Sequence, residues 1–98
     1  MMFEYDIQVK ISPPVLKRGK KAKLTATITN SNKEIAYCVG EIKGYNMRQR
    51  LEPTINDSYT VTLGIPFITP RGVYLIEVYA VSNDMEKGPA YQTEIKIV

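Results

Sequence analysis

The segment VYLIEVYAV, residues 73–81, is the longest stretch of the chain with apolar side chains recurring at every second position. Successive side chains of a β-strand point to opposite faces, so a period of two predicts a strand. The face expected in the core carries Tyr74, Ile76, Val78 and Ala80, and the opposite face carries Leu75, Glu77, Tyr79 and Val81. The segment therefore predicts the longest strand of a β protein, with apolar side chains on its outer face as well.

The same alternation recurs at residues 3–11, 24–29, 59–65 and 91–98. Two further stretches are also predicted strands: residues 35–42, which are apolar on both faces, and the short stretch 45–51. Turn-forming residues such as Pro13-Pro14 separate these stretches. No segment combines a 3.6-residue period with helix caps, so less than about 10% helix is expected. The spacing predicts a single all-β domain over residues 1–98, an antiparallel sandwich or barrel of about seven strands. The predicted core consists of Ile7, Val9, Leu24, Ile28, Val61, Leu63, Tyr74, Ile76, Val78 and Ile95.

The chain of 98 residues has no histidine and one cysteine, Cys38. Nucleophilic sites of the Ser-His-Asp and Cys-His types need histidine, as do histidine-based zinc, iron and copper sites. A single thiol cannot close an intrachain disulfide, so the core must hold the fold alone. No apolar run approaches the roughly 18 residues that a membrane span needs. We therefore expect a non-catalytic protein that uses no cofactor and no metal.

Two segments resemble a known family of modules. In residues 11–30, ISPPVLKRG leads to LTATITN, and residues 69–80 read TPRGVYLIEVYA. Both are similar to segments of the immunoglobulin-like and fibronectin-III-like modules that are repeated in bacterial and archaeal surface proteins. The resemblance implies an immunoglobulin-like β-sandwich of about seven strands. It also implies a tyrosine corner, in which the Tyr74 hydroxyl bonds to backbone in the loop of residues 66–71. The paired cysteines and core tryptophan of antibody domains are missing.

Five cations crowd one short stretch of the chain: Lys17, Arg18, Lys20, Lys21 and Lys23. The whole chain has 13 Lys and Arg against 10 Asp and Glu, so the remaining charges nearly cancel. One interpretation is a site for an anionic partner, such as a cell-wall polymer or anionic lipid. The other is a solvated turn whose lysines protect an edge strand from unwanted pairing. Because no aromatic residue is interleaved with these cations, we expect no nucleic-acid partner.

A second candidate surface is the outer face of the long strand and its expected neighbour at residues 35–42. Both segments are apolar at successive positions, and in immunoglobulin topology they lie side by side. Leu75, Tyr79, Val81 and Cys38 are predicted to form an exposed apolar patch that binds a partner. The alternative is that residues 45–53 fold back and cover it.

Two functions remain open at this point. The first is an interaction or spacer module of a larger cell-surface or secreted assembly, which contacts neighbouring domains or a second copy through its apolar sheet face. The second is a binding module for an anionic or carbohydrate polymer, which uses the basic turn and exposed tyrosines. The first residues are acidic where a secretion signal would be basic and apolar. We therefore expect an extracellular location as part of a longer chain, or a cytoplasmic one if the chain is complete.

Overall fold

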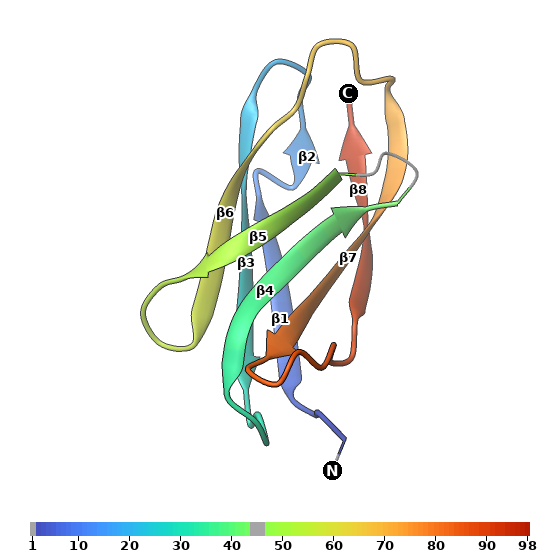
Figure 1. Cartoon of the computed structure of the whole chain (residues 1–98). Coiled ribbons are helices and arrows are strands. Elements are labelled where there is room, and N and C mark those ends of the chain that lie inside the picture. Colours follow the sequence, from blue (N-terminus) through green and yellow to red (C-terminus); the bar gives the residue numbers. More distant parts are fainter. Residues whose placement is uncertain (1, 44–46) are drawn as a thin grey trace.

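The alternating stretches form β-strands that pack as two layers in a computed structural model, which describes residues 2–43 and 47–98 (Figure 1). The strands are β1 (Asp6–Ser12), β2 (Val15–Leu16), β3 (Lys21–Thr29), β4 (Ile35–Ile42), β5 (Met47–Pro53), β6 (Ser58–Gly64), β7 (Gly72–Ser82) and β8 (Tyr91–Ile97). The all-β sandwich predicted from the sequence is confirmed, and β7 is the longest strand, as expected. Tyr45, at the start of the predicted stretch 45–51, lies outside the described residues.

The strands follow the order β1-β3-β6-β5-β4-β7-β8-β2, and every neighbouring pair is antiparallel except β2 and β8. β1, β3 and β6 form one layer, and β4, β7, β8 and β2 form the other. β5 joins the layers at one side, because its residues Met47 to Leu51 pair with β4 and its last two pair with β6. The chain also changes layers between β1 and β2, on the other side of the sandwich.

The change of layer between β1 and β2 occurs at Pro13-Pro14. Proline offers no backbone N–H to a ladder, so the pairing of β1 with β3 stops at Ser12. Val15 and Leu16 then pair in parallel with the end of β8. With two residues, β2 is too short to show an alternating pattern, so the sequence did not predict it.

The core lies between the layers and is built from alternate positions of each strand. In β3, Ala22, Leu24, Ala26 and Ile28 are buried, and the intervening Lys21, Lys23, Thr25 and Thr27 lie on the outer face. Of the predicted core, Leu24, Ile28, Leu63, Ile76, Val78 and Ile95 are buried, and Ile7, Val9, Val61 and Tyr74 are half-buried against them. Full burial of such a side chain stabilises the fold by roughly 1.5–3 kcal/mol.

One end of the sandwich is closed by the residues that precede β1. Phe3 is 1% exposed, and its ring meets that of Tyr5 edge to face at 5.0 Å. The Tyr5 hydroxyl accepts from the Ala80 N–H at 2.9 Å and donates to the Pro89 carbonyl. Lys33 then joins two loops of this closed end.

Lys33, in the β3–β4 loop, holds two carboxylates of the β7–β8 loop. Its Nζ lies 2.9 Å from Asp84 Oδ2 and 2.7 Å from Glu86 Oε1. The other Glu86 oxygen accepts from the Phe3 N–H at 2.8 Å. One lysine therefore pairs with both Asp84 and Glu86 in the closed end. No helix long and apolar enough to cross a membrane occurs in the described part of the chain.

Candidate functional site: the basic end

Three segments meet at the end of the sandwich opposite the closed end: the β2–β3 turn, the β6–β7 loop and the last residues of β8. The Gly19 N–H donates to the Ile65 carbonyl at 2.6 Å, and the Ile65 N–H donates to the Lys20 carbonyl at 3.0 Å. On the other side, the Arg18 N–H bonds to the Val98 carbonyl at 3.3 Å. Main-chain bonds thus pin the turn to both neighbours, and they fix the backbone from which its side chains project.

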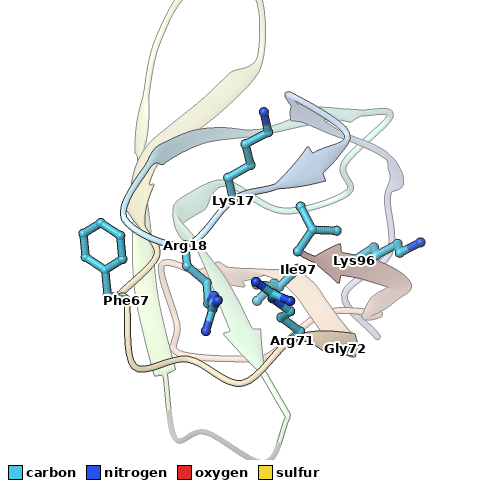
Figure 2. Close-up of a pocket in the computed structure, with 8 residues that line it drawn as sticks. Lys17, Arg18, Phe67, Arg71, Gly72, Lys96 and Ile97 are labelled. Carbon is cyan, nitrogen blue, oxygen red and sulfur yellow. The ribbon is translucent and has the colours of Figure 1, made fainter.

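An open depression of about 690 Å³ lies between these segments. Its lining comprises Lys17, Arg18, Phe67, Arg71, Gly72, Lys96, Ile97 and Val98. Figure 2 shows Arg18 and Arg71 in the middle of this set, with Phe67 on one side and Lys96 on the other. The described lining thus contains four cationic and no acidic side chains, and none of the four cations takes part in an ion pair within residues 2–43 and 47–98. We call this surface the basic end.

The ring of Phe67 lies directly over Gly19. A Cβ atom placed on Gly19 would come within 2.3 Å of the ring, and the φ of +77° at this residue is one that favours glycine. Despite this contact, Phe67 stays 76% exposed, and the next residue, Ile68, is 91% exposed. The depression therefore has an aromatic side chain in its lining, and Ile68 follows directly in the same loop. The sequence showed no aromatic residue among the cations because Phe67 comes from a loop distant in the chain.

The β6–β7 loop that carries these two side chains is held at its base. The Tyr74 hydroxyl donates to the Pro70 carbonyl at 2.6 Å, which confirms the predicted bond to the loop of residues 66–71. The Thr69 N–H donates to the Pro66 carbonyl at 3.1 Å, and Thr69 is buried. Beneath the loop lies an apolar pocket of about 210 Å³ lined by Ile42, Ile65, Pro66, Ile68, Thr69, Tyr74 and Ile97.

The five cations predicted as a group are divided by the fold. Lys17 and Arg18 line the depression. Lys20 is exposed in the turn, and Lys21 and Lys23 occupy the outer face of β3. A strand that follows directly on the turn alternates its side chains, so contiguous cations cannot all reach one surface. Arg71 and Lys96 line the depression in their place, and both lie too far along the chain from residues 17–23 to have been grouped with them.

The prediction that Cys38 belongs to an exposed patch is wrong in its placement. Cys38 is fully buried in the core and is paired with Leu51 of β5. Burial raises the pKa of its thiol to about 12. The outward positions of β4 are instead Tyr37 and Val39, which pack with β7. Because β4 is apolar at successive positions, its composition did not determine which set faces the core.

The remaining patch residues do lie on the outer face of β7, but two of them are covered. Tyr79 and Val81 are 2% and 5% exposed, whereas Leu75 is 38% exposed. Lys87 Nζ lies 4.4 Å from the centroid of the Tyr79 ring. Similarly, the Arg50 guanidinium lies 3.9 Å from the Tyr37 ring centroid.

Charged groups also bond to the Tyr79 hydroxyl. It donates to Glu41 Oε1 at 3.0 Å and accepts from Arg48 Nη2 at 3.1 Å. Burial, followed by the Glu41 carboxylate, raises the pKa of Tyr79. Arg48 and Arg50 belong to β5, which pairs beside β4 as a strand and does not fold back as a loop, so only its side chains reach this face. The outer face is therefore mostly a charged and aromatic surface.

Glu77 is a buried carboxylate in the same face, at 5% exposure. Gln92 Nε2 donates to it at 2.8 Å, and Lys87 and Lys43 lie 3.2 and 3.6 Å from its oxygens. The bond from Gln92 and then the nearby lysines hold its pKa below the usual range. Every partner of Glu77 thus serves to stabilise the carboxylate. Residues 2–43 and 47–98 contain no group of three or more acidic or thiol side chains placed to hold a metal ion.

No protein-family model matches this sequence, and no curated protein matches it. The fold does match solved structures. The fibronectin(III)-like modules of Clostridium thermocellum CbhA are 19% identical with a TM-score of 0.66, over 94% of this chain and 96% of theirs. A Niemann-Pick type C2 protein from the Japanese carpenter ant is 11% identical with a TM-score of 0.67, over 100% of this chain and 94% of its own.

A third similar structure is the endo-β-1,4-mannanase of Thermotoga petrophila, 13% identical with a TM-score of 0.68. The match covers 97% of this chain but 20% of the mannanase chain, so the similarity is to one part of a much longer protein. At identities this low, the structural similarity establishes the fold alone. The layers, the strand order and these similarities together show that the chain has an immunoglobulin-like fold of the fibronectin-III-like kind.

Proposed function

We propose that this protein is a non-catalytic binding module that contacts an anionic partner through its basic end. The observation that carries the proposal is the set of four cations around one depression whose described lining has no acidic side chain. Like charges held close together repel, and an anion placed between them relieves that repulsion. Arg18 and Arg71 offer planar guanidinium groups, which suit phosphate, sulfate and carboxylate groups.

The fold supports a role inside a larger assembly. One of the similar structures is of fibronectin(III)-like modules. In another, the similar segment makes up 20% of an enzyme chain. By analogy, we propose that this module works beside other domains, in a cell-surface or secreted protein. Its task there is to hold an anionic polymer, such as an acidic polysaccharide or polyphosphate, rather than to transform it.

The sheet face remains a second candidate, with a reduced area. Val15, Val73 and Leu75 are 42%, 62% and 38% exposed. Val15 and Val73 both lie opposite Lys96 in the register of the sheet, so they flank the basic end. A neighbouring domain or a second copy that docks there would bury an apolar strip next to the cations.

Calorimetric titration with inorganic polyphosphate tests the main proposal. We expect Lys17→Gln with Arg18→Gln to weaken binding about tenfold or more, or roughly 1.4 kcal/mol. Lys21→Gln with Lys23→Gln removes the same charge from the outer face of β3 and should change the affinity less than about twofold. Binding should also weaken with added salt. Equal losses in the two double variants would show that net charge alone attracts the polymer, and a parent protein that binds nothing would overturn the proposal.

A further inference from the structure

Two of the most exposed large apolar side chains of the described residues are consecutive in the β6–β7 loop, next to the basic end. Phe67 and Ile68, at 76% and 91% exposure, lie between Pro66 and Pro70. Apolar side chains this exposed gain nothing from a soluble polyanion, because such a polymer offers no apolar phase. Cations around an apolar loop tip are what an anionic lipid surface would recognise.

We propose that the basic end binds the surface of a bilayer containing anionic phospholipids. This inference rests on the proposed function, since the same cations meet the anion. Arg18 and Arg71 bond to lipid phosphates, while Phe67 and Ile68 enter the layer between headgroups and acyl chains. Lys17 and Lys96, at the margin of the depression, lie within reach of neighbouring headgroups.

The β6–β7 loop is already held in place without lipid. The Phe67 ring rests on Gly19, and the loop base is held by the bonds from Tyr74 to Pro70 and from Thr69 to Pro66. A loop that is already ordered loses little conformational entropy on binding, so more of its apolar transfer energy appears as affinity.

The distribution of charge orients the protein on the surface. The acids Asp84 and Glu86 lie in the closed end, where the N-terminal residues are, and the basic end is at the opposite tip of the sandwich (Figure 1). An anionic surface attracts the cations of the basic end, whereas the two acids at the other tip are already paired with Lys33 and lie well beyond the range of screened charges. The module therefore stands on the bilayer by its end, with the outer faces of both layers free for other partners.

Sedimentation with vesicles tests the proposal. The parent should bind vesicles of phosphatidylcholine mixed with phosphatidylserine, should bind pure phosphatidylcholine vesicles much more weakly, and should be released by salt. Phe67→Ser with Ile68→Ser should weaken vesicle binding about tenfold or more. Ile68→Ser alone, at a residue outside the lining of the depression, should weaken vesicle binding and change polyphosphate binding less than about twofold. The control is Ile55→Ser, which removes an apolar side chain of similar exposure, 79%, from the β5–β6 turn.

A reporter places the loop directly. Phe67→Trp should show a blue-shifted emission when phosphatidylserine vesicles are added, and quenchers attached to the lipids should reduce that emission. Circular dichroism of each variant establishes that it is folded.

The outcomes separate the two proposals. If polyphosphate binds and vesicles do not, the lipid inference is wrong and the proposed function stands. If neither binds, both are wrong. Vesicle binding that is indifferent to phosphatidylserine, or unaltered by the double serine variant, would also overturn the inference.

Discussion

Tyr74 and Tyr79 lie on opposite faces of the same strand, and their hydroxyl groups have different kinds of hydrogen-bond partner. Tyr74 donates to one backbone carbonyl at the exposed loop base. Tyr79 is nearly buried and connects Glu41 to Arg48. A hydrogen bond to a charged group contributes more than one to a neutral group. From the sequence, the Tyr74 hydroxyl is expected to contribute more to stability than the Tyr79 hydroxyl, because Tyr79 is predicted to lie in an exposed patch.

The structure reverses that expected order. Tyr79→Phe should lower the free energy of unfolding by about 1.5–3 kcal/mol, and Tyr74→Phe by about 0.5–1.5 kcal/mol. Urea denaturation of both variants beside the parent gives the comparison. Since each loses a single oxygen, errors of scale cancel. A larger loss for Tyr74→Phe would mean that Glu41 and Arg48 find equally good partners without the Tyr79 hydroxyl.

Cys38 should be chemically silent while the protein is folded. Its pKa of about 12, which follows from burial, leaves almost no thiolate at pH 8, and the thiolate is the reactive form. We expect no reaction with a disulfide reagent at pH 8 until denaturant is added, when one thiol per chain should react. Rapid labelling of the folded protein would place the thiol at the surface.

Gly19 and Gly64 offer a matched pair of glycine substitutions. Gly19→Ala meets both a φ of +77° and the Phe67 ring, whereas an added Cβ on Gly64 has nothing within 4 Å. Gly19→Ala should therefore destabilise the protein by about 1 kcal/mol or more, and Gly64→Ala should be neutral to within roughly 0.5 kcal/mol. Thermal melts of the two variants test this, and equal shifts would show that the ring moves aside freely.

At the level of elements, alternation predicted the strands well where one face is polar. β3 alternates cleanly between buried and outward positions, and the long strand β7 has the predicted parity, with Ile76, Val78 and Ala80 in the core. Both faces of β4 are apolar, so the sequence pattern did not indicate which set of side chains faces the core. Cys38 was therefore assigned to the wrong face. Nor could local sequence assemble the basic end, since Arg71 and Lys96 join Lys17 only through tertiary pairing of β2, β7 and β8.

β5 has the weakest sequence signal but an important position, since it joins the two layers. Its single buried anchor among the residues with described burial is Leu51, which is fully buried. Leu51→Ala should cost about 2–5 kcal/mol, comparable with Ile76→Ala in the long strand. Urea denaturation measures both. A loss below roughly 1 kcal/mol for Leu51→Ala would mean that β5 contributes little to the core.

For the whole molecule, the pairing of Asp84 and Glu86 with Lys33 affects stability at low pH. The bond from Ser82, followed by that from Lys33, lowers the pKa of Asp84 to about 2. The same lysine lowers the pKa of Glu86. A carboxyl whose pKa is lower in the folded state stabilises the fold above its unfolded pKa and loses that effect as the pH falls.

Melting temperature should therefore decline as the pH falls from about 4.5 towards about 2. Lys33→Met should lower the melting temperature at pH 7, and its difference from the parent should shrink across the same interval. Lys21→Met, on the outer face of β3, serves as the control. A difference that stays constant down to pH 2 would show that Lys33 acts through its aliphatic stem rather than through the two carboxylates.

The parallel pairing of β2 with β8 has a mechanical consequence. Figure 1 places the first described residues and the end of β8 at opposite tips of a molecule about 42 Å long. Tension applied between these tips would draw β8 one way and β2, through β1, the other. The bonds that join them, among them the 2.9 Å bond from the Val98 N–H to the Leu16 carbonyl, would be loaded along the strands. They must then rupture together rather than unzip one by one, so the module should resist stretching in a chain under load.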